Sequence, residues 1–134
     1  IMHEIIGIHQ FMMYAADTPM QWAFAEYLRH PEHYLGLSAF YQQKRDRLVA
    51  LLADSPFRLQ PSAGSFFMLA GYGHLSQQSD SEIVQRLITE CGVATIPLSA
   101  FYTDGTDNKF IRLSFSKDDK TLLAGAEALC RFTV

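Results

Sequence analysis

An arginine in an alternating segment near the C-terminal end is the residue best suited to bind an anion. Residues 110–115 alternate between two kinds of side chain, which is the period of a β-strand. One set is Ile111, Leu113 and Phe115, and the other is Phe110, Arg112 and Ser114. A strand would present Arg112 as a rigid charged fork, suited to bidentate capture of a carboxylate or phosphate. The alternative is an arginine on a solvated sheet face, because most arginines are exposed.

The other residues that could bind a metal ion or act as a nucleophile give weaker indications of a functional site. His3, Glu4 and His9 lack the spacing of a helical zinc motif, so no metal site is expected. His30 and His33 lie on either side of a proline and are expected on the surface at a helix junction. All lysines are expected to be solvated surface residues. These are Lys44, Lys109, Lys117 and Lys120.

The composition fits one folded domain without a nucleic-acid partner. A chain of 134 residues can bury roughly two thirds of its unfolded surface, so its core needs neither disulfide nor metal. Eleven basic against fourteen acidic side chains give a formal net charge of −3, which offers no electrostatic basis for holding a phosphate backbone. Cys91 and Cys130 lie in apolar helical patterns, so both are expected to be small core residues. Cysteines used in this way are typical of proteins in a reducing compartment. No apolar run approaches the ~20 residues that span a bilayer, so we expect a cytoplasmic protein with no membrane partner.

The N-terminal part is predicted to be helical. Residues 1–14 carry apolar side chains round most of a helix, which is therefore expected to pack against something outside this chain. The pattern begins at once without a capping residue, so the chain is expected to be cut from something longer. Pro19 favours a helix over residues 18–29, and Pro31 predicts its end. A long helix is expected over residues 32–53, with its charged face solvated.

The C-terminal part is predicted to mix strands and helices. Strands at residues 57–61 and 66–70 flank a turn sequence and predict a hairpin. Ser79 and Glu82 have capping-box spacing and open a helix that ends at Gly92. The remaining elements are a strand at 93–96, a strand at 109–116 and a helix whose apolar face is Leu122, Ala126, Leu129 and Phe132. This order predicts an α+β fold, with a small mixed sheet packed against helices on one face.

Three stretches of the sequence, taken in order, resemble a known family. They are PSAGSFF at 61–67, GVATIPLSAF at 92–101 and FIRLSF at 110–115. Together they resemble the small C-terminal domain of class I and II pyridoxal-phosphate aminotransferases, which share the aspartate aminotransferase-like fold type I. Shorter stretches are most similar to the methionine and kynurenine branch: HQF at 9–11, TPMQ at 18–21 and IPLSAFY at 96–102. The resemblance covers residues 1–134, so the large cofactor-binding domain is expected to lie outside this chain.

The resemblance implies that Arg112 binds the α-carboxylate of an amino-acid substrate. Gly64 and Phe66 would lie beside the substrate entrance, where Gly64 would permit a close backbone approach. The alternative for Gly64 is a plain hairpin glycine. Phe101 would end a loop that moves as the domains close on substrate, although it could equally be a core aromatic. Residues 14–18 would border the active site of a neighbouring subunit, which implies a homodimer.

The activity implied is transfer of an amino group from an amino acid, such as methionine or an aromatic one, to a 2-oxo acid with pyridoxal 5'-phosphate. In the family, the lysine that binds the cofactor and the residues for its ring nitrogen and phosphate belong to the large domain. This chain is therefore expected neither to hold the cofactor covalently nor to transaminate alone. A β-lyase of the same fold and a stand-alone module that binds a small carboxylate remain alternatives.

Overall fold

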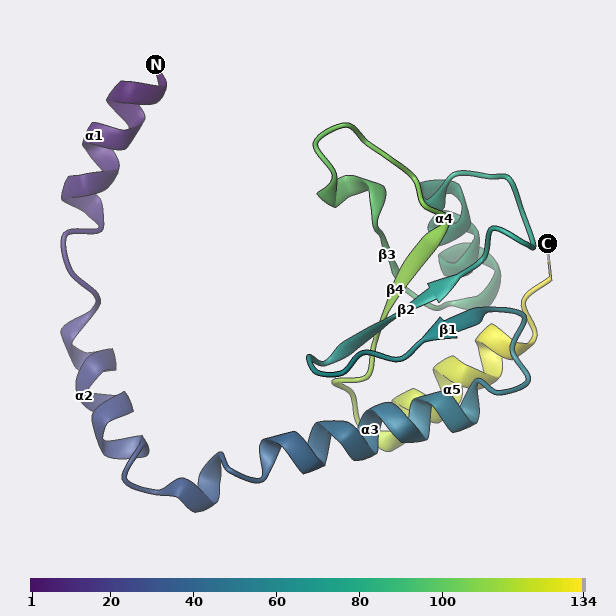
Figure 1. The fold of residues 1–134 in the computed structure, drawn as a ribbon, viewed down its shortest axis with the longest axis horizontal. Coiled ribbons are helices and arrows are strands. Elements are labelled where there is room, and N and C mark those ends of the chain that lie inside the picture. Colours follow the sequence, from purple (N-terminus) through teal and green to yellow (C-terminus); the bar gives the residue numbers. More distant parts are fainter. Residues whose placement is uncertain (134) are drawn as a thin grey trace. The chain divides into compact units, whose positions relative to one another are not determined.

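The computed structural model describes residues 1–133, which fall into two units, the first ending at Leu37. The first unit is helical. It contains α1 (Met2–Met12) and α2 (Thr18–Tyr27), both labelled in Figure 1, and the 3-10 helix η1 (Pro31–His33). Both predicted helices are confirmed, each slightly shorter than expected. Among the described residues, no helix combines the length and the apolar character needed to cross a membrane.

Helix α2 begins where the sequence predicts because Asp17 caps it. The Asp17 carboxylate accepts a hydrogen bond from the Met20 backbone N–H at 3.1 Å, with Pro19 in the first turn. Neither α1 nor α2 contains a buried residue, and their exposed side chains include Phe11 and Trp22. Many exposed apolar side chains on neighbouring helical segments are typical of an interaction site. That α1 packs against something outside the chain stays a prediction.

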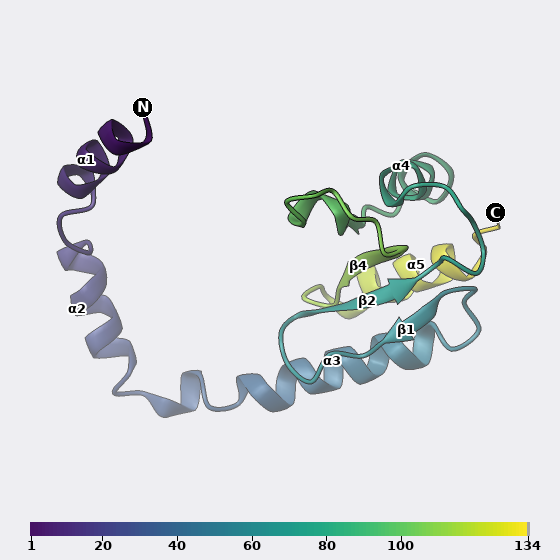
Figure 2. The same ribbon diagram turned by 45° about the horizontal axis from the view of Figure 1, so that its top comes forward.

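The second unit packs a four-stranded sheet against helices. Its strands are β1 (Arg58–Gln60), β2 (Phe67–Gly71), β3 (Ile96–Pro97) and β4 (Phe110–Ser114). Its helices are α3 (Leu37–Leu51), α4 (Asp80–Cys91), α5 (Asp119–Cys130) and the 3-10 helix η2 (Ser99–Phe101). Figures 1 and 2 show α3 and α5 side by side. The predicted α+β class is confirmed.

The sheet is antiparallel, and the prediction of a mixed sheet is wrong. The strand order is β1-β2-β4-β3, and each described pairing is antiparallel. Strands β2 and β3 do run in the same direction, as a crossover through α4 favours. However, β4 inserts between them and pairs with both, so no parallel pair forms.

The core of the second unit lies between one face of the sheet and the three helices α3, α4 and α5. Buried side chains alternate along β2 and β4, which confirms the predicted alternation of the last strand. The buried strand residues are Met68, Ala70, Ile111 and Leu113, and helical partners include Leu48, Ile83, Leu87, Leu122 and Leu129. Cys91 and Cys130 are free thiols that pack partly buried against this core. Only one face of the sheet is thus covered by helices.

Helix α3 begins at Leu37, five residues later than predicted. The preceding residues form η1 and a turn, in which the Tyr34 and Leu37 N–H groups donate to carbonyls three residues back. This turn contains Gly36, and glycine is a poor helix former. The strong helical propensity of the segment therefore takes effect only after the glycine.

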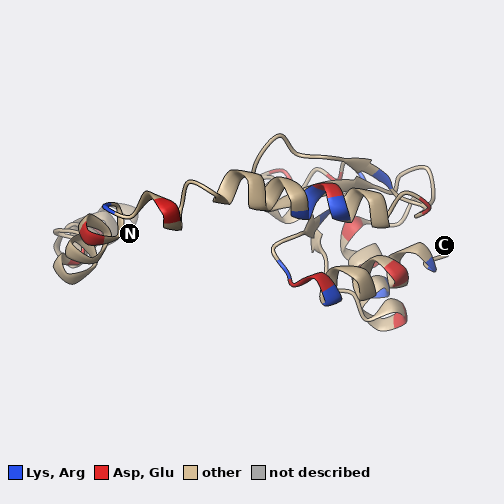
Figure 3. Ribbon diagram, turned by 90° about the horizontal axis from the view of Figure 1, so that it is seen from below, with Lys and Arg blue, Asp and Glu red and all other residues tan. Residues whose placement is uncertain are grey.

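The charged side of α3 is structural, not simply solvated as predicted. Figure 3 shows basic and acidic positions next to one another along α3. The Lys44 ammonium donates to Asp119 at 2.7 Å and is only 16% exposed, and the Arg47 guanidinium donates to the same carboxylate at 2.6 Å. The Arg45 guanidinium donates to the Ser62 carbonyl at 2.8 Å. These contacts fasten α3 to α5 and to the loop between β1 and β2.

Candidate functional site

Arg112 lies in the middle of the sheet, on the face opposite α3, α4 and α5. Strand β4 is an inner strand, and Arg112 is the register partner of Leu69 on β2 and of Ile96 on β3. Its neighbours in sequence, Ile111 and Leu113, are buried in the core. A side chain on an inner strand starts from a backbone that is hydrogen-bonded on both sides. The guanidinium therefore has a rigid base, as a binding site requires.

Two aromatic rings border the Arg112 guanidinium. Its central carbon Cζ lies 4.7 Å from the centroid of Phe67 and 5.5 Å from that of Phe101. Both distances are within the range of a cation–π contact. None of the side-chain hydrogen bonds and ion pairs formed within residues 1–133 involves the Arg112 guanidinium. Its N–H donors are therefore available to an anion from outside this chain.

The surface around Arg112 contains no carboxylate from the described strands. The outward strand positions are Arg58, Gln60, Phe67, Leu69, Ile96, Phe110, Arg112 and Ser114. Because Leu69 and Ile96 flank Arg112 directly, the local surface is apolar. Apolar surroundings strengthen a charge-assisted bond to an arriving anion relative to water.

Of the two predicted binding aromatics, Phe101 borders Arg112 directly, whereas Phe66 contacts Phe67; binding of substrate by either stays a prediction. Phe101 is 64% exposed, so the alternative of a core aromatic is wrong for the described chain. Phe66 is half exposed and packs edge-to-face on Phe67, with ring centroids 5.6 Å apart. Phe67 thus connects Phe66 to Arg112. Phe67 belongs to the PSAGSFF stretch but was not among the predicted binding residues, although the period-two pattern of β2 places it on the same face as Leu69.

Gly64 lies in the loop between β1 and β2, and this chain does not itself require a glycine there. A Cβ added at Gly64 meets nothing within 4 Å, and the left-handed backbone of the loop is at Ser65, with φ 72°. The loop is held by the Ser62 hydroxyl, which donates to the Phe67 carbonyl at 2.8 Å. Contact of Gly64 with a substrate stays a prediction.

A buried carboxylate that sequence reasoning missed lies at the start of α4. Asp80 is 1% exposed, and both of its oxygens accept hydrogen bonds from Ser99 at the start of η2. The Ser99 backbone N–H and its hydroxyl each donate at 2.7 Å. The predicted capping box of Ser79 and Glu82 is present one residue earlier. The residues around Asp80 pointed to a cap, and nothing in their spacing pointed to Ser99.

A second carboxylate, Asp107, completes this polar network. It accepts hydrogen bonds from the Asp80 N–H at 3.0 Å and from the Lys109 N–H and ammonium, each at 2.8 Å. Burial raises the pKa of Asp107, but the hydrogen bonds from Lys109 and from the Asp80 N–H, together with the Lys109 charge, outweigh it, so the net pKa lies below the usual value. Burial and the Asp107 charge raise the pKa of Tyr72 well above its usual range. Lys109 has a left-handed backbone, with φ 60°, and is not the solvated lysine that was predicted.

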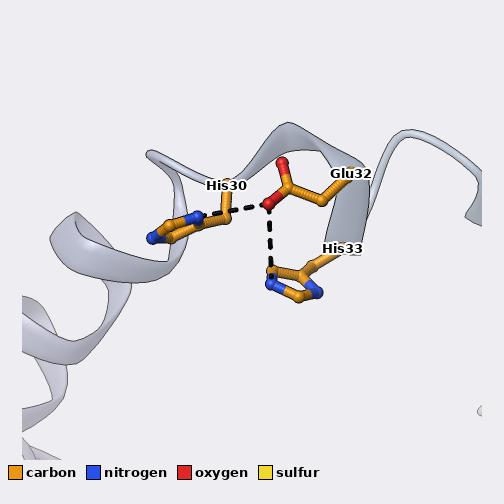
Figure 4. Close-up of side chains that lie close together, drawn as sticks. All are labelled: His30, Glu32 and His33. Atoms are coloured by element: carbon orange, nitrogen blue, oxygen red, sulfur yellow. Dashed lines mark hydrogen bonds and ion pairs between the residues drawn. The ribbon is translucent and has the colours of Figure 1, made fainter.

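Figure 4 shows another cluster, in the first unit. The Glu32 Oε1 atom lies 3.2 Å from His30 Nδ1 and 3.8 Å from His33 Nε2. All three side chains are more than half exposed, which confirms the predicted surface position of both histidines. The contact of each imidazole with the shared carboxylate accounts for the cluster, so we assign no metal to it.

A hollow of about 760 Å³ lies between the end of α4, the segment after it and α5. Its walls include Cys91, Thr95 and Gly125, and none of the predicted site residues lines it. The Thr95 hydroxyl is buried there without a hydrogen-bond partner among the described residues. The hollow is separate from the surface that carries Arg112.

Comparison with known proteins gives the family. The model of the family "Aminotransferase class I and II" matches residues 2–129, and the chain belongs to this family. Methionine aminotransferase of Escherichia coli is 47% identical, over 94% of this chain and 33% of its own length. Kynurenine–oxoglutarate transaminase of Dictyostelium discoideum is 31% identical, over 91% of this chain and 33% of its own.

A solved structure agrees with these relatives. The Escherichia coli protein whose crystal structure identified a methionine aminotransferase function has a TM-score of 0.83 and 46% identity, over 97% of this chain and 34% of that one. The predicted resemblance and the fold type I architecture are thereby confirmed. The chain spans about one third of the length of the relatives that it matches.

Proposed function

We propose that this chain is the C-terminal small domain of an aminotransferase and that Arg112 binds the α-carboxylate of its substrates. The observation that carries the proposal is the Arg112 guanidinium, which has no acidic partner among the described residues and rises from an inner strand between two aromatic rings. Membership of the aminotransferase family supports it. The large domain is proposed to be supplied by a part of the protein outside residues 1–134.

The proposed role of Arg112 is orientation. A carboxylate can accept two parallel bonds from a guanidinium, each contributing about 1.5–3 kcal/mol. Such a clamp fixes the direction of the substrate's Cα–H bond before the bond is broken, which lowers the entropic part of the barrier. The ring of Phe67 below the guanidinium restrains its plane. Arg112 is therefore a binding and positioning group, and it moves no proton.

Class I and II aminotransferases depend on pyridoxal phosphate, which when bound supplies the electron sink for breaking the substrate's Cα–H bond. We propose that this chain does not hold the cofactor covalently. The Lys44 and Lys109 ammonium groups contact Asp119 and Asp107 at 2.7 and 2.8 Å, so neither is a free amine beside Arg112. This supports the proposal that the cofactor is held outside this chain.

The proposed substrates are an amino acid with a large apolar side chain and a 2-oxo acid. The names of the relatives, a methionine aminotransferase and a kynurenine–oxoglutarate transaminase, support this choice. The apolar surroundings of Arg112, formed by Phe67, Phe101 and Leu69, are compatible with such a donor. The family match favours transamination over a β-lyase or a stand-alone carboxylate-binding module.

The proposed assembly is a cytoplasmic homodimer. The exposed apolar side chains of α1 and α2 offer the surface that a partner subunit or the large domain would cover. The two free cysteines fit a reducing compartment. Size measurement of the full-length protein by light scattering tests the dimer.

The function is tested with the full-length protein, L-methionine and 2-oxoglutarate. Transamination predicts one glutamate formed for each oxo acid derived from methionine, and no turnover without 2-oxoglutarate. Pyruvate and ammonia released from cystathionine without an acceptor would instead indicate a β-lyase. Saturable binding of amino acids by residues 1–134 alone, without cofactor, would indicate the stand-alone module.

A further inference from the structure

We propose that Asp80 is a positioning residue for Arg112, because it fastens both ends of the loop that places Phe101 on the guanidinium. The inference rests on the proposed function, in which Arg112 binds the substrate carboxylate. According to this inference, Asp80 lies outside the substrate-binding surface but affects the affinity of the enzyme for amino-acid substrates.

The contacts of Asp80 reach two segments that are far apart in the sequence. Its carboxylate accepts both hydrogen bonds from Ser99, 19 residues away, and its backbone N–H donates to Asp107, 27 residues away. One residue at the start of α4 thus holds both ends of the segment 99–107. The residues between these ends are largely exposed and include Phe101.

Because Asp80 is buried, its carboxylate depends on hydrogen bonds from neighbouring residues. The side chain is almost fully buried, and a buried carboxylate is costly unless hydrogen bonds replace its water. No ion pair within the described residues involves Asp80, so its compensation comes from the two Ser99 donors and a longer contact with Ser81. The α4 cap itself is formed by Ser79 and Glu82, so Asp80 is not needed to start the helix.

The link from Ser99 to Arg112 is short and stiff. Ser99 begins the single 3-10 turn η2, and Phe101 ends it. The Phe101 N–H donates to the Leu98 carbonyl at 3.0 Å, which closes the turn. The Phe101 ring then lies 5.5 Å from the Arg112 Cζ. A displacement of Ser99 is therefore transmitted to the ring that borders the guanidinium.

The experiment compares variants of the full-length enzyme with L-methionine and 2-oxoglutarate. Asp80→Ala is expected to raise KM for methionine about fivefold, the factor that corresponds to one cation–π contact, with kcat within about twofold. Amide hydrogen exchange in residues 99–107 is expected to accelerate. Asp80→Asn has the shape and the polar atoms to form hydrogen bonds with the Ser99 N–H and hydroxyl. Its KM for methionine and its amide hydrogen exchange in residues 99–107 should therefore be close to those of the wild type. Ser99→Ala, which keeps the backbone bond, should raise KM less than Asp80→Ala.

The matched control is Asp118→Ala. Asp118 caps α5 by accepting, like Asp80, one backbone N–H and one hydroxyl, both from Thr121 at 2.8 Å. This variant should lose stability without a change in KM. Equal KM values for Asp80→Ala and Asp118→Ala, or unchanged amide hydrogen exchange in residues 99–107, would overturn the inference. Transamination by the wild-type enzyme would still support the proposed function in that case. A wild-type enzyme that transfers no amino group would overturn both, and if Asp80→Ala does not fold, Ser99→Ala decides by the same two measurements.

Discussion

The Arg112 guanidinium lies over the Phe67 ring, with 4.7 Å between its carbon and the ring centroid. The two residues come from adjacent strands, β4 and β2, and Phe67 lies two positions before Leu69, the register partner of Arg112. The contact is therefore a diagonal pair across an antiparallel ladder, held by hydrogen bonds on both strands. A cation stacked on a ring keeps its in-plane N–H donors free for a planar anion such as a carboxylate.

Replacing Arg112 by lysine keeps the charge and removes the planar fork. Loss of one charge-assisted bond, about 1.5–3 kcal/mol, corresponds to a roughly 10- to 150-fold fall in kcat/KM for amino acids. The absorbance of the bound cofactor should not change. Steady-state kinetics of the full-length enzyme measure this. Arg58→Lys, an exposed arginine on the same sheet face, should match the wild type, and wild-type kinetics in Arg112→Lys would remove Arg112 from the site.

Replacing Phe67 by leucine removes the ring beneath the guanidinium but keeps an apolar side chain. A cation–π contact of about 0.5–1 kcal/mol corresponds to a roughly two- to fivefold rise in KM for the amino acid. The control is Phe110→Leu on β4, the same substitution on the same sheet face, at a ring that forms no cation–π pair with Arg112 among the described residues. An equal rise in both variants would show that the effect is general packing and not support of Arg112.

The stability of the chain should fall in acid partly through Asp107. Its pKa is lowered in the folded state, so it stabilises the fold fully above its unfolded value of about 3.9, and this contribution is lost as the pH falls through the folded value. Asp107→Asn should be less stable than the wild type at pH 7 and should lose less on acidification. Urea denaturation between pH 2 and pH 7 measures both curves. Parallel curves would contradict the prediction, because other carboxylates act equally in both proteins.

Two glycine-to-alanine changes should have opposite effects on stability. Gly92 ends α4 in the left-handed region, with φ 68°, so Gly92→Ala should cost about 1–2 kcal/mol even though a Cβ there meets nothing within 4 Å. Gly125 lies inside α5 with the same open space, so Gly125→Ala should stabilise by about 0.5–1 kcal/mol. Thermal unfolding followed by circular dichroism tests the pair. Higher stability in both variants would show that the left-handed backbone at Gly92 does not destabilise an alanine there.

Several features follow from residues close together in the sequence and were predicted correctly. Pro19 lies in the first turn of α2, the box of Ser79 and Glu82 opens α4, and Gly92 ends it. The alternation around Arg112 identified its side of the strand before any sheet was known. Caps and periodicity depend on groups within about one helical turn or two strand positions, so the local sequence contains them.

The direction of strand pairing and the polar contacts of the site depend on residues distant in the sequence. Insertion of β4 between β2 and β3 made the sheet antiparallel. The hydrogen bonds between Asp80 and Ser99, and between Lys44 and Asp119, join residues 19 and 75 positions apart. Such partners leave no repeating pattern in the chain, because their spacing depends on the path of the loops between them. The sequence alone therefore predicted most of the elements, the family and Arg112 as the candidate anion-binding residue, because these depend on local patterns. Only the tertiary structure decided which aromatic rings border that arginine and which distant residues pair around it.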